Sequence, residues 1–462
     1  MSNVNLEISP SNVLSNGKVS FKNGNPVITF IIGETDKLLI GRSVRLAGKF
    51  RVKVNDVGDE TDMVVCNDLI TSSARLGVYG AIDQLVIKSQ QTHQVIEHIR
   101  HYNRFMSSYL PNTTSLCDGT SHLAESALVM PNWNVYKQSV LDNTAQATTG
   151  NSFCVPLPCG LFNGTQDIPL SSTWGLKGLL VEIHLTPDNN FLFSHTGDTA
   201  AIPATPAPGL TNASYELSDL KLVCEAINPS AEMLKSYSAK GGTFEYNSIS
   251  SYFTSINSTN AIINFNLGLK KVLGVFMNFI SSSKINNLAD DGMATPPLQN
   301  SFVTDSVQPS PIQQLVFQRG GEKFPLEYNI DYLGTDGLEY REVDSQVFRN
   351  FSNSIKTWSK NDRLTTSQYN THERTNQLLP QGREHFLQAT SGDKTGSLDG
   401  GSGFGVGMSY DVISDEGVDF STQAFGVQMS VDLTTDNPQA VFLFCHSKNT
   451  LVYSPNGLQV LV

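Results

Sequence analysis

The sequence has few charged residues and no concentrated basic segment. Asp, Glu, Lys and Arg make up 16% of its 462 residues, whereas about 25% is typical of globular proteins. The 31 basic and 43 acidic residues give a formal net charge of −12, and the basic ones are scattered along the chain. Proteins that bind nucleic acid through its phosphates present clustered Lys and Arg side chains. We therefore expect no direct, sequence-specific binding of nucleic acid.

The sequence also has no long apolar segment, and its first residues do not have the pattern of a secretory leader. The first ten residues, MSNVNLEISP, contain neither a basic nor an apolar region of the signal-peptide type, so we expect synthesis inside a cell without a signal peptide. The longest apolar stretch, residues 272–280 (VLGVFMNFI), includes Asn278. It has less than half of the ~20 residues that a membrane-spanning helix needs.

Cysteines are few, and their spacing is irregular. The absence of a CxxC pair argues against the common zinc and redox motifs, so we expect reduced, buried thiols. The six cysteines are Cys66, Cys117, Cys154, Cys159, Cys224 and Cys445.

Short segments rich in β-branched and aromatic residues occupy much of the chain. Most are flanked by Gly, Pro, Asn or Asp, which is typical of strands joined by turns. Every second residue from Val427 to Leu433 is apolar, as in a strand with one buried face. The predicted strands are residues 18–21, 27–32, 49–54, 63–66, 84–88, 179–185 and 215–224 in the first half, and 261–267, 271–280, 314–318, 404–412, 424–433, 440–446 and 458–462 in the second.

Two segments have the periodicity of an amphipathic helix, one in each half. They span residues 91–110, which Pro111 follows, and residues 344–358, for which Asp344 is a suitable N-cap. Their apolar stripes consist of Val95, Ile99, Tyr102, Met106 and Tyr109 in the first, and Val347, Phe351, Ile355 and Trp358 in the second.

A faint internal repeat links the two halves. Residues 82–87 (IDQLVI) match 312–317 (IQQLVF), and residues 183–189 (IHLTPDN) match 431–437 (VDLTTDN), at separations of 230 and 248 residues. A strand that ends at residues 223–224 matches one that ends at 444–445, at a separation of 221 residues. The three matches occur in the same order, which favours a tandem duplication with its boundary near residues 228–242.

These patterns predict an all-β fold of two tandem jelly-roll β-sandwiches, with long loops and one or two helices per half. Two halves of about 200 residues suit jelly rolls better than immunoglobulin sandwiches, which close in about 100. We expect an N-terminal arm (1–17), a first jelly roll (18–228), a linker (229–242) and a second jelly roll (243–462).

One segment offers residues at the spacing of metal ligands. His93, Glu97 and His101 share a face of the predicted helix 91–110, with His98 nearby. Their order is not HExxH, however, so we interpret them as the wetted face of that helix. An acidic run, Asp56, Asp59, Glu60 and Asp62, lacks the spacing of a calcium loop and is interpreted as a solvated hairpin tip.

The remaining candidates each lack a part that the chemistry needs. The glycines of residues 400–407 are followed by strand-like alternation instead of GK[ST] and a helix, so a loop entering a strand is expected. Cys154 and Cys159 have no adjacent His to activate a thiolate, and Trp174 and Trp358 suit packing better than sugar binding. We therefore predict no catalytic, cofactor-binding or metal-binding residues, and no enzymatic activity.

The chain resembles the double jelly-roll major capsid proteins of the adenovirus-hexon-like lineage, especially those of polinton-like viruses, adintoviruses and virophages. The residues that carry the resemblance are 215–227 (YELSDLKLVCEAI), the run from Gly405 through GVDFSTQAFGVQMSVDLTTDN, and the last strand, 457–462 (GLQVLV).

This resemblance implies a homotrimer that forms a pseudo-hexameric capsomer in the icosahedral shell of a DNA-virus virion. Neighbouring capsomers, penton proteins and minor capsid proteins would be its partners, and the presence of an underlying membrane stays open. It also implies outer towers built from inserted loops, for which residues 111–151, 191–212, 281–311 and 359–402 are the candidates. A fibre, tail or carbohydrate-binding β-sandwich module is the alternative.

Overall fold

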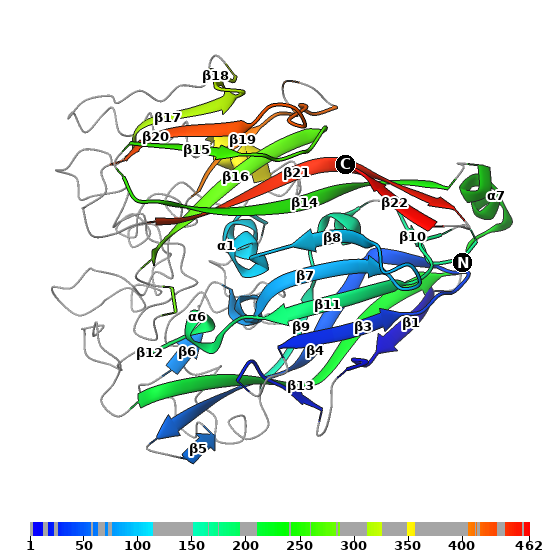
Figure 1. Cartoon of the computed structure of the whole chain (residues 1–462). Helices are drawn as coiled ribbons and strands as arrows, with labels where there is room; N and C mark the ends of the chain where they lie inside the picture. Colours follow the sequence, from blue (N-terminus) through cyan, green and yellow to red (C-terminus); the bar gives the residue numbers. More distant parts are fainter. Residues whose placement is uncertain are drawn as a thin grey trace, which may run out of the picture.

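In a computed structural model, the chain forms antiparallel β-sheets arranged as two successive sandwiches (Figure 1). The first sandwich uses strands between residues 3 and 227, and the second uses strands between residues 243 and 461. The structure describes residues 3–12, 17–22, 26–56, 59–62, 70–72, 76–113, 151–164, 166–173, 175–194, 210–239, 242–258, 260–282, 285–286, 312–325, 349–355, 405–411, 413, 416–431, 439–454 and 457–462.

The first large sheet has seven strands and is built around β4 and β13. β1 and β2 pair with β13, whereas β5, β9 and β10 pair with β4. The strands are β1 (Asn3–Ile8), β2 (Lys18–Val19), β4 (Leu38–Asp56), β5 (Asp59–Asp62), β9 (Asn151–Pro156), β10 (Ile168–Pro169) and β13 (Leu210–Ile227). Residues of the expected N-terminal arm thus form an edge strand of this sheet.

The first small sheet has four strands in the order β3-β11-β7-β8. They are β3 (Val27–Ile32), β11 (Leu179–Leu185), β7 (Ile82–Ser89) and β8 (Val95–Ile99). Alternate residues of β11 are buried, as expected for a strand with one face on a core. Phe30 of β3 and Leu46 of β4 belong to that core, which joins the small sheet to the large one. β6 (Ile70–Ser72) and β12 (Leu192–Ser194) form a separate two-stranded ribbon.

The second sandwich repeats this plan, with fewer strands among the described residues. The second large sheet has the order β14-β21-β16-β19, with β22 also paired to β21, and the second small sheet has the order β15-β20-β17-β18. The strands are β14 (Thr243–Ile256), β15 (Asn260–Phe265), β16 (Val272–Ser281), β17 (Ile312–Arg319), β18 (Glu322–Lys323), β19 (Val406–Ser409), β20 (Phe425–Val431), β21 (Gln439–Ser454) and β22 (Gly457–Leu461).

The two small sheets share the same irregularity. In each, one extra residue, Asp83 in β7 and Gln313 in β17, stands without a partner in the adjacent strand, which is a β-bulge. The flanking pairs are Ile82 with Leu185 and Gln84 with His184 in the first sheet, and Ile312 with Val431 and Gln314 with Ser430 in the second. This shared bulge makes β7 equivalent to β17, and β11 equivalent to β20.

The described part of the chain contains few helices. They are the 3₁₀ turn η1 (Gly77–Ala81), α1 (Tyr102–Thr113), α5 (Gly160–Asn163), α6 (Asp188–Phe191) and α7 (Ala231–Ala239), together with helical residues 349–355. The last segment confirms the central part of the predicted helix 344–358. α7 lies inside the expected linker between the two sandwiches.

The predicted helix 91–110 is wrong over its first half. Residues 95–99 form β8, which pairs with β7, and the helix begins only at Tyr102. His93 and His101 have positive φ values of 53° and 54°, and such left-handed residues interrupt a helix. The apolar stripe at helical spacing therefore combines residues of a strand and of a separate helix.

The predicted all-β fold of two jelly-roll sandwiches is confirmed. The predicted strands 27–32 and 179–185 coincide with β3 and β11. Five others lie within longer strands, and six overlap strands with different bounds. The predicted strand 63–66 lies outside the described residues, as do most of the candidate tower loops.

Candidate functional site: the junction between the two sandwiches

The first sandwich meets the outer face of the second large sheet through α1. The ring centroid of Phe105 in α1 lies 6.1 Å from that of Phe276 and 5.7 Å from that of Phe444. The guanidinium carbon of Arg104 lies 5.3 Å from the ring centroid of Phe442. Figure 1 shows α1 between the two sandwiches, beside β14. Aromatic packing of this kind holds the two halves together.

A buried amide fixes the register of this contact. The Nδ2 atom of Asn278 in β16 lies 2.6 Å from the carbonyl oxygen of Arg104, and it also lies 3.0 Å from Oγ of Ser108 and 3.3 Å from Oγ of Ser107. Asn278 is 1% exposed, so these partners replace the water that its amide loses on folding. Asn278, which interrupts the apolar run 272–280, therefore holds the two sandwiches together through hydrogen bonds.

Glu97 of β8 connects three segments with one carboxylate. Its Oε1 accepts hydrogen bonds from the backbone N–H of Gly160 at 3.0 Å and of Ile249 at 2.8 Å, and its Oε2 accepts from Leu161 at 3.0 Å. Gly160 and Leu161 begin α5 in the first sandwich, whereas Ile249 lies in β14 of the second. The carboxylate thereby ties the start of α5 to the neighbouring sandwich.

Burial controls the charge of Glu97. Loss of hydration raises its pKa from 4.5 to about 7, although the three backbone hydrogen bonds oppose this shift. The nearby thiol of Cys159 also has a raised pKa, caused first by burial and then by the charge of Glu97. A thiol held in its protonated form is a weak nucleophile. This arrangement favours a structural role for the pair.

The junction leaves no room for a side chain at Gly160. A Cβ atom added there would lie 1.6 Å from the carbonyl oxygen of Asn247 in β14, so the backbones of α5 and β14 are in direct contact. The sequence offers no signal for this requirement, because the two residues are distant along the chain.

The three residues at metal-ligand spacing do not share a helix face. His93 is an exposed turn residue and Glu97 is buried under α5. The ring centroid of His101 lies 4.9 Å from that of Phe442 and 5.7 Å from that of Phe253. Interpreting them as one wetted helix face was therefore wrong. Lone Glu97 in the apolar strand VIEHI was the available signal for a buried carboxylate.

The other candidates fall on strands or outside the described residues. The acidic run lies on β4 and β5, which pair as a hairpin, as predicted. Gly405 precedes β19 and Gly407 lies within it, and an added Cβ would clash with Phe351 at the first position and with Ser354 at the second. Trp174, Trp358, Cys66 and Cys117 lie outside the described residues. The four described cysteines are free thiols, and only Cys154 among them is not buried.

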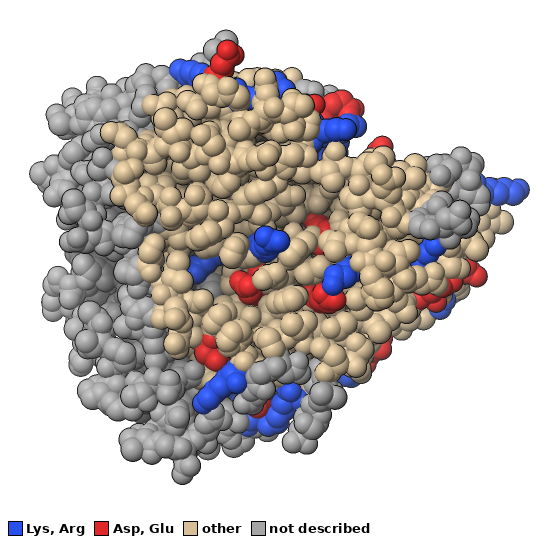
Figure 2. Space-filling view, in the orientation of Figure 1, with Lys and Arg blue, Asp and Glu red and all other residues tan. Residues whose placement is uncertain are grey.

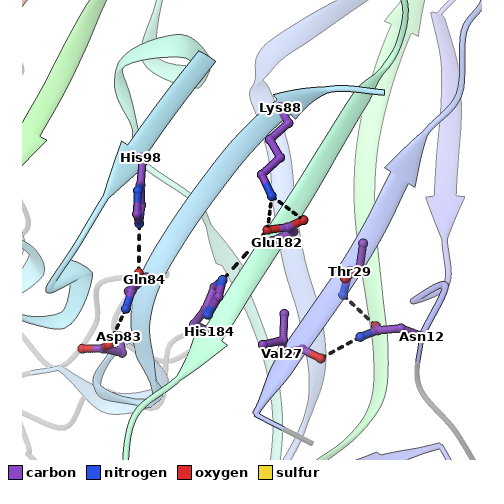
Figure 3. A network of polar contacts seen from close by, with 9 residues as sticks. All are labelled: Asn12, Val27, Thr29, Asp83, Gln84, Lys88, His98, Glu182 and His184. Carbon is purple, nitrogen blue, oxygen red and sulfur yellow. Dashed lines mark hydrogen bonds and ion pairs between the residues drawn. The ribbon is translucent and has the colours of Figure 1, made fainter. Parts of the chain in front are cut away.

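The outer face of the first small sheet carries a polar network (Figure 3). Nζ of Lys88 lies 2.8 Å from both carboxylate oxygens of Glu182. Nε2 of His184 lies 4.0 Å from the same carboxylate, and Nε2 of His98 lies 2.9 Å from Oε1 of Gln84. Burial is the main cause that lowers the pKa of His98, so this ring is neutral at pH 7.

The second small sheet has amides where the first has this ion pair. Counting from the shared bulge, Gln318 occupies the place of Lys88, and Gln428 occupies that of Glu182. Nε2 of Gln318 donates to Oε1 of Gln428 at 3.2 Å. Figure 2 shows charged atoms of both signs over the first small sheet and mainly uncharged atoms over β14, β15 and β20.

Within the described residues, no group of three or more His, Cys, Asp or Glu side chains is arranged to bind a metal ion. None of the helices in that part of the chain is long and apolar enough to cross a membrane.

Solved structures with the same arrangement of both sandwiches are viral capsid proteins. The Faustovirus major capsid protein aligns with 98% of this chain and 90% of its own, at a TM-score of 0.57 and 9% identity. The fold is a double jelly roll. A chain of the Sputnik virophage structure covers 100% of this chain and 88% of its own (TM-score 0.53, 11% identity), and the mavirus major capsid protein covers 99% and 89% (TM-score 0.50, 10% identity).

Among the comparisons with known proteins, the double jelly roll is found through structure alone. No family model matches the sequence, and no curated protein matches it.

Proposed function

We propose that this chain is the major capsid protein of an icosahedral DNA virus and that it assembles as a homotrimer without catalysing a reaction. The observation that carries the proposal is the likeness of the entire double jelly roll to viral major capsid proteins, which covers at least 98% of the chain in the three comparisons. Three copies supply six similar sandwiches, and a head-to-tail contact between copies closes such a set into a pseudo-hexagonal ring.

The proposed domains follow the expected boundaries. Residues 18–228 and 243–462 form the two jelly rolls, residues 1–17 add β1 to the first, and residues 229–242 with α7 connect them. The rigid junction around Glu97 and Asn278 supports this division, because it sets one sandwich against the other within each copy.

The virion shell is the proposed location of the chain. Its proposed partners are further copies of itself, neighbouring capsomers, and penton and minor capsid proteins. The scattered basic residues and the net charge of −12 support a shell role without direct binding of nucleic acid.

Light scattering coupled to size-exclusion chromatography tests this proposal. Three chains of 50.4 kDa predict a particle of about 150 kDa. A stable monomer that binds glycans on an array would contradict the proposal and favour a carbohydrate-binding module.

A further inference from the structure

The two small sheets differ at one edge strand. β3 and β15 occupy equivalent places, because Thr29 of β3 pairs with Glu182 as Ile262 of β15 pairs with Gln428. Each of these strands lies at the end of its sheet and pairs with one neighbour, β11 or β20, among the described strands. The backbone N–H and C=O groups on the other side of an edge strand can bind a further segment of polypeptide.

In the first sandwich, a short segment before β2 covers this edge (Figure 3). The backbone N–H of Ser11 donates to the carbonyl oxygen of Thr29 at 2.7 Å. The side-chain amide of Asn12 donates from Nδ2 to the carbonyl oxygen of Val27 and accepts at Oδ1 from the N–H of Thr29, both at 2.8 Å. The edge of β3 is therefore bound by an uncharged segment through one main-chain N–H and one carboxamide.

The covering segment exists because the strand beside β13 is interrupted. β1 and β2 both pair with β13, and Ser11 and Asn12 lie in the interruption between them. In the second sandwich, β14 pairs with β21 along 14 residues without an interruption. The second sandwich thus has no equivalent segment to cover β15.

The backbone of Ile262 faces the open side of β15. The carbonyl oxygen of Ala424, next to β20, accepts a hydrogen bond from the N–H of Gly320 at 2.9 Å and so points toward β17. Successive residues of a strand alternate in the side to which their N–H and C=O groups point, so those of Gln428 also point toward β17. The groups of Ile262, opposite Gln428, consequently point away from β20.

The exposed side chains of β15 are uncharged. Ile262 is 65% exposed, and the neighbours on its face are the exposed residues Asn260 and Asn264. Edge strands are commonly protected from pairing by Lys, Pro or a bulge, and β15 (NAIINF) has none of these along its continuous register with β20. One backbone group is engaged locally, since the carbonyl oxygen of Asn260 accepts from Oγ of Ser258 at 2.8 Å.

We propose that the edge of β15 binds a short, uncharged peptide segment of another protein chain, in the way that β3 binds Ser11 and Asn12. A main-chain N–H of that segment donates to the carbonyl oxygen of Ile262, and a carboxamide accepts from the N–H of Ile262. Main-chain hydrogen bonds supply the affinity in edge binding of this kind. A charged segment would lose hydration at this surface without gaining a charged partner. The inference does not depend on the proposed trimer.

A synthetic peptide tests this site in the full-length chain. The probe has the sequence of residues 8–14 (ISPSNVL) and is capped at both ends, so that it carries no charge. The same peptide methylated at the backbone nitrogen of the Ser11 position lacks the donated N–H and is the matched control. Amide hydrogen exchange, resolved to single residues, reports on the edges of β3 and β15.

Two variants locate the binding of the peptide. Ile262→Pro removes the outward N–H and leaves the hydrogen bonds between β15 and β20 in place, as Pro does at the open side of an edge strand. Ile262→Val keeps the N–H and an apolar side chain and is the control. Fluorescence anisotropy of the labelled peptide measures its Kd for each variant.

In the chain alone, we expect the amide of Ile262 to exchange faster than that of Thr29, which Asn12 protects. Peptide at about four times its Kd should slow exchange at Ile262 about fivefold. Ile262→Pro should raise the Kd about tenfold, whereas Ile262→Val should change it by less than about threefold.

Three results would overturn the inference. An Ile262 amide that exchanges as slowly as Thr29 in the chain alone would mean that the chain covers its own edge. Slowing that grows with protein concentration in the absence of peptide would mean that a second copy covers it. Exchange at Ile262 that the peptide leaves unchanged, or a Kd that neither backbone methylation nor Ile262→Pro alters, would mean that the edge is not the binding site.

Discussion

The outer faces of the two large sheets differ although the sheets occupy equivalent places in the two sandwiches. The second face is lined by the aromatic rings of Phe276, Phe442 and Phe444 and is covered by the first sandwich. The first sheet instead carries ion pairs: that of Lys49 with Asp219 is solvent-exposed, whereas that of Arg51 with Glu216 is largely buried. Equivalent strands thus keep the same pairing, whereas the side chains on their outer faces differ in chemistry according to what each face contacts.

The largest effect is expected from removing the aromatic contact at the covered face. Phe105→Ala leaves a cavity between α1 and the second large sheet, so we expect the free energy of unfolding to fall by about 3–5 kcal/mol. Urea denaturation measures this change. Ile262→Ala, at a side chain that is 65% exposed on β15, is the control, with an expected change within about 0.5 kcal/mol.

The free energy of unfolding should depend on pH because of Glu97. The folded chain holds the Glu97 proton up to about pH 7, whereas the unfolded chain releases it near the ordinary pKa of 4.5. The contribution of Glu97 to stability is therefore greatest below pH 4.5 and declines, by roughly 3 kcal/mol in total, as the pH rises to about 7.

Denaturation of the wild type and of Glu97→Gln at a series of pH values measures this decline. The difference between their free energies of unfolding should change across pH 4.5–7, because Gln does not titrate. A constant difference would contradict a buried, titrating carboxylate at position 97.

The close approach of α5 and β14 gives a third test. Gly160→Ala places a Cβ atom against the carbonyl oxygen of Asn247. We therefore expect the free energy of opening the junction to fall by about 1–3 kcal/mol. Hydrogen exchange of the Ile249 amide should accelerate about five- to 150-fold in consequence. Gly164→Ala is the matched control, since its nearest neighbour would lie at 3.6 Å. Equal exchange rates in the two variants would disprove direct backbone contact at the junction.

The smallest effect is expected on the small sheets. Replacing the amide pair of the second small sheet by the ion pair of the first tests whether the two sheets are equivalent. Gln318→Lys with Gln428→Glu copies the pair Lys88–Glu182 into the second sheet. A double-mutant cycle should give a coupling of about 0.2–1 kcal/mol that weakens with added salt. A coupling of zero would mean that the two sites do not share their geometry.

The strands were predictable because their periodicity is local. Residues 27–32 and 179–185 alternate between buried and less buried positions, and the structure places β3 and β11 there. The helix 91–110 was wrong because Val95 and Ile99 have helical spacing by coincidence, while His101 in a left-handed conformation separates β8 from α1. α7 was missed because a linker was expected from the repeat alone.

The repeat was located correctly, but one of its alignments was displaced. The sequence matched Ile183 with Val431 through the Asp-Asn motifs that follow, whereas the strand register makes Ile183 equivalent to Met429, two residues away. A shift of two keeps the same face buried, so periodicity alone does not reveal it. Glu97 and Gly160 were not predictable as junction residues, because their partners are distant in sequence.

Electron microscopy of the assembled wild-type protein tests the central claim most directly. The duplicated sandwiches predict three chains in a closed ring of six lobes, with first and second sandwiches alternating. A particle with fewer or more than three chains, or one whose copies meet through identical surfaces, would contradict it.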